Sequence, residues 1–254
     1  MSDYDQEMLE LFYNNILSGK VRLEHLQDNQ FGSSTRDVCI HSADGIDDTI
    51  YIFDKCEAKA INKLTLERLN NLITNENIPV IGRLIDFLAG KKIKYLAINY
   101  KGKHVDIDTF FNTFRDVLSK VTDEVYIRNL NFSQSHLKLI IEACSGVKTI
   151  VLSNCNIGSI SDNFNIRNDL DYKIKTINLE NFSDNRSKDK DLKTTNFTIF
   201  IEAIQTTNMK ENLKFFGIKD SFLNVKSVEK IMEAFASVSV KDLAVIKKVS
   251  NAFD

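Results

Sequence analysis

The chain has few cysteines, one proline and no tryptophan, and each shortage carries information. Of its 254 residues, four are Cys, one is Pro and none is Trp. The cysteines show no Cys-x-x-Cys pair and no regular framework, so neither a disulfide scaffold nor a metal site is indicated. Cys144 and Cys155 fall at apolar positions of the surrounding pattern. We therefore expect buried free thiols in a reduced, intracellular protein.

Long hydrophobic runs and an excess of one charge are also missing. No apolar stretch reaches the ~18 residues of a membrane span, and the first residues are acidic instead of basic-then-apolar. We expect no secretory signal and no membrane insertion. The formal net charge of −2 gives no general attraction to phosphate backbones, so no nucleic-acid partner is expected. We expect a cytoplasmic location, or a cytoskeletal or ciliary one, in preference to an organellar one.

Residues that carry chemistry are scattered. The four histidines lie far apart, and none stands at a ligand or triad spacing from a cysteine or carboxylate. The pair His104 and Asp106 precedes a helical pattern and indicates a loop with a cap. Phosphate-binding glycine loops, metalloprotease helices and nucleophile elbows are absent from the sequence. We expect no catalytic residue, no cofactor and no metal.

A short pattern recurs along the C-terminal two thirds of the chain. In residues 147–157 apolar side chains occupy relative positions 1, 4, 6 and 11, with Cys155 at position 9. Alternation over five residues is typical of a strand that turns one face into a core. The fourth positions of six such units are Leu96, Val125, Ile150, Ile177, Phe216 and Leu243. Their spacing, mostly in the high twenties, indicates a strand-plus-helix repeat.

Helical periodicity fills the intervals between these strands. Apolar residues at i, i+3, i+4 and i+7 predict helices in the segments 81–88, 107–121, 137–144, 197–204 and 228–235. Ser133 or Ser135 is placed to cap the third of them. A period of 2 that gives way to a period of 3.6, and then returns, predicts an α/β repeat whose units must stack to bury their apolar faces.

These residues resemble the leucine-rich repeat superfamily, in its ribonuclease-inhibitor-like branch with long, helix-containing repeats. The resemblance covers roughly residues 60–254 and implies a curved solenoid, with a parallel β-sheet on the concave face and helices on the convex face. It departs from the family at the ninth position, where Cys155 alone fits well. The other units carry Lys101, Leu130, Phe182, Ser221 and Lys248 there. We therefore expect irregular repeats without a continuous asparagine ladder.

The boundaries follow from the same patterns. Residues 1–60 predict an N-terminal cap, made of a helix at 7–17 and a hairpin-like pair of strands at 38–40 and 50–52 around Asp44-Gly45. Residues 61–254 form the predicted solenoid. The stretch 61–66 fits a repeat strand or part of a helix. The segment 158–172 has no helical face, and the charged run 183–195 predicts a surface loop.

Strand geometry singles out one surface. Positions 3, 5 and 7 of each strand point away from the core, onto the predicted concave face. Aromatic residues in a mixed-charge setting favour protein interfaces. The candidate partner-binding residues on this face are Tyr95, Asn99, Glu124, Tyr126, Arg128, Asn178, Glu180, Phe215 and Lys219.

The sequence thus predicts a non-enzymatic protein-interaction or scaffold module that binds protein partners as a subunit of a larger assembly. Abundant Asn, Ile, Lys and Phe indicate an AT-rich genome, and we expect a protist-like eukaryote. Two alternatives stay open. One is an effector of leucine-rich-repeat type that binds a host target. The other is an enzyme whose site is assembled from dispersed residues.

Overall fold

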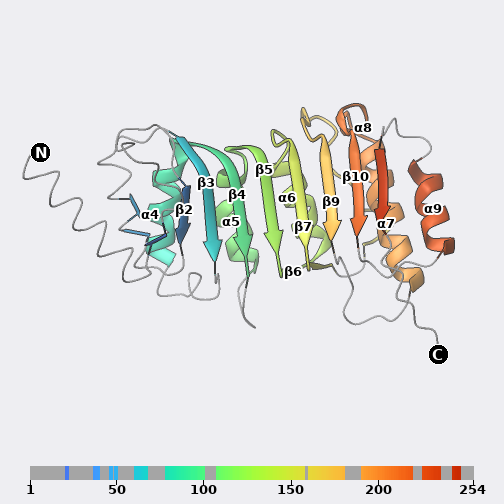
Figure 1. Cartoon of the computed structure of the whole chain (residues 1–254), viewed down its shortest axis with the longest axis horizontal. Coiled ribbons are helices and arrows are strands. Elements are labelled where there is room, and N and C mark those ends of the chain that lie inside the picture. Colours follow the sequence, from blue (N-terminus) through green and yellow to red (C-terminus); the bar gives the residue numbers. More distant parts are fainter. Residues whose placement is uncertain are drawn as a thin grey trace, which may run out of the picture. The chain divides into compact units, whose positions relative to one another are not determined.

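The computed structural model describes residues 21–22, 37–40, 46–47, 49–50, 60–67, 78–100, 107–157, 160–180, 190–219, 225–235 and 242–246. The chain divides into two compact units, Met1–Thr122 and Asp123–Asp254. Both are α/β: open sheets of mainly parallel strands alternate along the chain with helices (Figure 1). The predicted fold class is confirmed at this level.

The described part of the first unit contains four strands in the order β1-β2-β3-β4. They are β1 (Val21–Arg22), β2 (Asp37–Ile40), β3 (Ala60–Glu67) and β4 (Lys92–Asn99). β1 is antiparallel to β2, whereas β2, β3 and β4 are parallel. The helices α4 (Ile78–Ala89) and α5 (Ile107–Leu118) also belong to this unit. The undecided stretch 61–66 is therefore a strand.

The hairpin expected near the N-terminus is wrong. β2 pairs with β1 and β3, and the described residues among 46–50 are helical. The physical reason is burial: Ile40 and Ile46 are both fully buried, so each contributes to the core from its own element. In the helix, Ile46 and Ile50 lie four residues apart on one face. The predicted helix 7–17 and residues 51–52 lie outside the described part of the chain.

The second unit contains a parallel sheet in the order β5-β7-β9-β10-β11. β5 (Val121–Arg128) begins two residues before the unit boundary. The other strands are β7 (Thr149–Ser153), β9 (Thr176–Glu180), β10 (Phe215–Lys219) and β11 (Asp242–Ile246). The short strands β6 (Asn131–Phe132) and β8 (Asn156–Ile157) pair separately. The helices are α6 (Gln134–Ala143), α7 (Lys190–Gln205), α8 (Met209–Asn212) and α9 (Val225–Phe235).

The strands pair in the register that the apolar pattern predicts. In the second unit the fourth positions form one continuous row, from Val125 through Ile150, Ile177 and Phe216 to Leu243. In the first unit Leu64 lies opposite Leu96. A slip of one residue would move every apolar side chain to the other face, so the buried row fixes the register.

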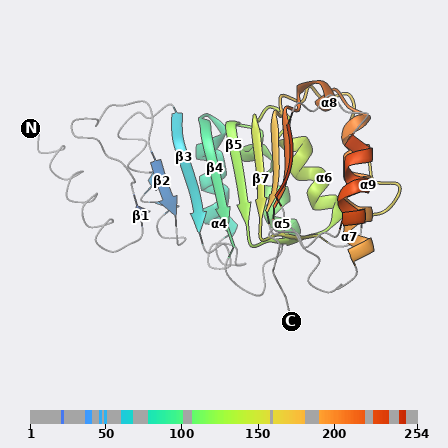
Figure 2. The same cartoon turned by 45° about the vertical axis from the view of Figure 1, so that its right-hand side comes forward.

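The helices lie over one face of the sheet in each unit, and the core fills the space between (Figures 1 and 2). In the second unit the ring of Phe200 on α7 lies 6.3 Å from the ring of Phe216 on β10. In the first unit the rings of Phe110 and Phe114 on α5 stack at 4.6 Å. Burial of each such side chain contributes about 1.5–3 kcal/mol. The opposite face of each sheet carries the more exposed side chains.

The five helices expected between the strands are present, although Val121 begins β5 instead of ending the helix predicted over 107–121. Part of one predicted loop is also helical. Lys190–Thr195 belong to α7, so the expectation of a loop over 183–195 is wrong for these residues. Residues 183–189 lie outside the described ranges. The apolar residues of α7 are buried from Phe197 onward and anchor the helix. Once that helix exists, extension by these six residues costs little free energy even for a charged sequence.

Candidate functional site

The second unit presents seven of the predicted residues on one surface. Parallel pairing in register aligns positions 3, 5 and 7 of β5, β7, β9 and β10 into three rows. We call these rows the outer face. The first row is Glu124, Thr149, Thr176 and Phe215; the second is Tyr126, Val151, Asn178 and Gly217; the third is Arg128, Ser153, Glu180 and Lys219.

Tyr95 and Asn99 belong to the first unit and form a separate column. Both lie on β4, where Tyr95 is opposite Lys63 and Asn99 is opposite Glu67 of β3. The Lys94 ammonium lies 5.1 Å from the centre of the Tyr95 ring, within the range of a cation–π contact. These two predicted residues are therefore described apart from the outer face.

β7 contributes the smallest side chains of the outer face. Val151 and Ser153 are only 7% and 5% exposed although they point away from the core. Their neighbours across the ladder, Tyr126 and Asn178 beside Val151, are larger and partly exposed. The larger side chains on β5 and β9 therefore cover β7 between them. They form most of the exposed surface of the outer face.

Gly217 leaves room for two neighbouring side chains of the outer face. A Cβ atom at this position would lie 2.4 Å from Asn178 Oδ1 and 2.8 Å from Phe215 Cε1. Both distances are far below van der Waals contact, so any side chain at 217 would displace the amide, the ring or both. Sequence reasoning placed Phe215 and Asn178 on this face but did not identify Gly217 as the residue that positions them.

Charges of both signs lie on the outer face. Arg128 and Lys219 are exposed, and Glu180 stands between them in the row that also holds Ser153. Among the described residues, Arg128 has no ion-pair partner. Burial raises the pKa of Glu124 above its usual value, because partial desolvation penalises the carboxylate.

Asparagine pairs close the ends of two strands. Asn129 and Asn154 follow β5 and β7 with φ angles of 62° and 50°, in the left-handed region that Asn tolerates better than most residues. The Asn154 amide donates to Asn129 Oδ1 at 3.3 Å, and the Asn156 amide donates to Asn131 Oδ1 at 2.6 Å. The repeated pattern Asn-x-Asn at these two places, 25 residues apart, is the signal that the ninth-position argument missed.

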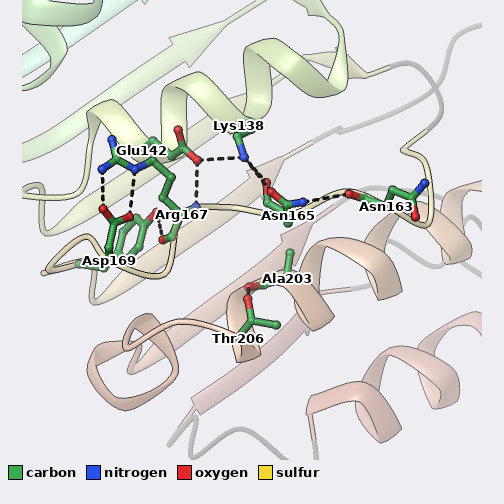
Figure 3. A network of polar contacts seen from close by, with 9 residues as sticks. Lys138, Glu142, Asn163, Asn165, Arg167, Asp169, Ala203 and Thr206 are labelled. Carbon is green, nitrogen blue, oxygen red and sulfur yellow. Dashed lines mark hydrogen bonds and ion pairs between the residues drawn. The ribbon is translucent and has the colours of Figure 1, made fainter.

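A segment without helix or strand, residues 160–175, occupies the place where the other intervals have a helix. Figure 3 shows how side chains from α6 hold its backbone. Lys138 Nζ donates to the carbonyl oxygen of Asn165 at 2.8 Å, and Glu142 Oε1 accepts from the backbone N–H of Arg167 at 2.9 Å. Gln134 Oε1 accepts from the backbone N–H of Ser161 at 2.8 Å.

The other side of this segment is held from α7 and α8. Asn196 Oδ1 accepts from the Ile160 N–H at 2.8 Å, and Asn208 Oδ1 accepts from the Tyr172 N–H at 3.2 Å. The Asn212 amide donates to the Tyr172 carbonyl at 2.6 Å. Tyr172 is fully buried, and its hydroxyl donates to the Arg167 carbonyl at 2.9 Å. We call this set of contacts the bracket; it replaces the hydrogen bonds that a helix would supply.

The described groups offer little for catalysis. His136 is used structurally: its ring nitrogen accepts from the Ser133 N–H at 3.1 Å in the capping box of α6. Burial raises the pKa of the Cys155 thiol to about 12, so it is not a nucleophile at neutral pH. Among the described residues, no His, Cys, Asp and Glu side chains gather in a group able to hold a metal ion. No helix within the described ranges has the length and apolar character to cross a membrane.

Comparison with known proteins adds no family. The chain matches no protein-family model and no curated protein sequence. The outer face of the second unit is therefore the candidate site on its geometry alone.

Proposed function

We propose that the chain is a non-enzymatic protein–protein recognition module of leucine-rich-repeat type. In this proposal the parallel sheets form the concave side of a curved solenoid, and the helices form its convex side. Parallel strands in one register, at the spacing of a strand-plus-helix repeat, support this assignment. An array of this kind presents its sheet face as an extended binding surface.

One observation carries the proposal. The outer face holds two partly exposed aromatic residues, Tyr126 and Phe215, beside the exposed cations Arg128 and Lys219. Tyr and Arg are the residue types most often found at the energetic centres of protein interfaces. The rings need no movement to be presented, since β-strands hold their backbones and Gly217 leaves room for Phe215.

The partner is proposed to be a protein, and the chain a subunit of a larger assembly. The mixed signs of Arg128, Glu180 and Lys219 fit a protein surface of both charges better than a uniformly charged polymer. The setting we propose is the cytoplasm, cytoskeleton or cilium of a protist-like eukaryote with an AT-rich genome.

The test compares partner recovery by matched variants. Tagged wild-type chain is purified from its own cells beside Tyr126→Ala with Arg128→Glu. We expect the stoichiometric partners to fall by at least about tenfold in this variant, because loss of an interface anchor costs about 2 kcal/mol or more. Phe215→Ala with Lys219→Glu repeats the test on β10.

The control changes the same kinds of side chain on a helix. Met232 on α9 is 53% exposed and Lys230 is exposed beside it. Met232→Ala with Lys230→Glu should leave partner recovery unchanged. Equal recovery by all three variants would refute the outer face as the contact surface, and a wild-type chain without stoichiometric partners would refute the subunit role.

A further inference from the structure

A row of lysines precedes the strands of the second unit at the edge where they begin. Lys148, Lys175 and Lys214 stand directly before β7, β9 and β10. They occupy one position of the repeat, since each is followed two residues later by the buried residue of the fourth position. This edge is at the top of the sheet in Figure 1.

Backbone hydrogen bonds fix the three lysines relative to one another. The Lys148 carbonyl accepts from the N–H groups of Lys175 and Thr176 at 2.8 and 3.0 Å. The Lys175 carbonyl accepts in the same way from Lys214 and Phe215, at 2.8 and 3.0 Å. Neighbouring strands lie about 4.8 Å apart, so the row is about 10 Å long. A repeated bond pattern makes it a defined array on the sheet edge.

The row carries an uncompensated positive charge. Lys148 forms an ion pair with Asp123 at one end. Lys175 and Lys214 are exposed and have no ion pair among the described residues. Lys173 adds a further exposed cation two residues before Lys175. Like charges this close repel each other weakly in water, and a ligand of opposite charge relieves that repulsion.

The size of the row favours an acidic protein segment over nucleic acid. Proteins that bind duplex DNA through its backbone make roughly six to ten phosphate contacts. This row offers two or three cations within about 10 Å, in a chain whose net charge is −2. In an extended peptide the side chains on one side repeat at about 6.6 Å. Two or three carboxylates on such a segment therefore span the row, and the flexible lysine side chains absorb the difference in spacing.

We infer that the edge formed by Lys148, Lys175 and Lys214 is a second docking surface, which binds an extended acidic segment of a protein partner laid across the starts of β7, β9 and β10. The site adjoins the first row of the outer face, and it uses charge where the outer face uses aromatic anchors. It stands whether or not the outer face binds a partner.

The probe is a fluorescein-labelled octaglutamate peptide, titrated with the full chain and followed by fluorescence anisotropy at low salt. Lys175→Glu with Lys214→Glu should weaken binding by about tenfold or more, because each change replaces an attraction with a repulsion. The matched control is Lys230→Glu on α9, which is compared with Lys175→Glu alone because the two single changes alter the net charge equally. It should bind within about twofold of wild type.

Octaglutamine and an eight-nucleotide thymidine oligomer complete the design. No binding to octaglutamine and weaker binding to the oligonucleotide support the inference. Three results would overturn it: no binding of octaglutamate by the wild-type chain, equal weakening by Lys175→Glu and Lys230→Glu, or tighter binding of the oligonucleotide. Circular dichroism of the variants confirms that each is folded before its affinity is compared.

Discussion

At the scale of single residues, position 217 connects the fold to the proposed binding surface. Glycine within a strand usually costs about 0.5–1 kcal/mol, because it loses more conformational freedom than other residues. Here the missing Cβ leaves the space that the Asn178 amide and the Phe215 ring occupy. The arrangement of the outer face therefore depends on a residue that presents no side chain.

Gly217→Ala tests this dependence. The new methyl group should displace Phe215 or Asn178 and lower the free energy of unfolding by about 1 kcal/mol, since over-packing outweighs the gain in strand propensity. Urea denaturation measures the stability, and the NMR shift of the Asn178 side-chain amide reports the displacement. Gly146→Ala is the control, because nothing lies within 4 Å of a Cβ there. An unshifted Asn178 amide in Gly217→Ala would contradict the packing argument.

Residues also show where sequence reasoning falls short. The ninth position predicted a buried turn at Cys155, and the structure places that thiol fully buried. The asparagine contacts occur one residue to either side, at Asn154 and Asn156. Because Asn is abundant in this chain, each of these residues by itself gave no indication of a contact. Their pairing with Asn129 and Asn131 is a contact between strands, and it becomes visible only when the register is known.

At the scale of elements, the bracket shows how one interval does without a helix. Among the described contacts, side chains hydrogen-bond eight backbone groups of residues 160–175. Six of these side chains come from α6, α7 and α8 with its N-cap, and two, Asn165 and Tyr172, lie within the segment. The three α6 residues, Gln134, Lys138 and Glu142, are spaced four apart and form one polar stripe. Each bond contributes about 1 kcal/mol net, and leaving a buried group unpaired costs more.

Tyr172→Phe tests the bracket. Removal of the hydroxyl leaves the Arg167 carbonyl without this donor, and we expect a loss of about 1–2 kcal/mol in the free energy of unfolding. The matched control is Tyr126→Phe on the outer face, which should change stability by less than about 0.5 kcal/mol. Urea denaturation of both variants measures the difference. Equal stability of the two would show that the Tyr172 hydroxyl does not hold the segment.

Local sequence patterns predicted some helices and strands and failed for others. Alternating apolar residues predicted β4, β7, β9 and β10 because each strand buries one face in the core. The first turns of α7 were missed because Lys190–Thr195 are charged and carry no apolar stripe. The sequence did not decide whether β3 is a strand, since residues 61–66 fit both the period of a strand and that of a helix. The hairpin failed because a turn signal at Asp44-Gly45 says nothing about which strand β2 pairs with.

At the scale of the whole molecule, the strands of the second unit differ in how many neighbours they pair with. In the second unit β9 has a parallel neighbour on both sides, β7 and β10. Among the described strands, β11 ends the order and pairs only with β10. A strand that is paired on one side leaves backbone groups exposed to water and opens at a lower free energy.

Hydrogen exchange should reflect this order. We expect the amides of β9 to exchange at least about tenfold more slowly than those of β11, because β9 must lose two neighbours before its amides open. Mass spectrometry of peptides that cover 176–180 and 242–246 measures both rates in one experiment. β10, which is paired on both sides, is the internal control. Faster exchange in β9 than in β11 would contradict the strand order.

The sequence by itself determined the period of the molecule: alternation of 2 and 3.6 residues is a local property, and it reports which side chains enter a core. That was enough for the strands, most helices, the buried thiols and seven residues on one surface. Only the tertiary structure decided what depends on neighbours. The contact of Gly217 with Asn178, the bracket around residues 160–175 and the lysine row join residues that are 25 to 40 positions apart. Strand register brings such residues together, and no pattern within one strand or helix contains it.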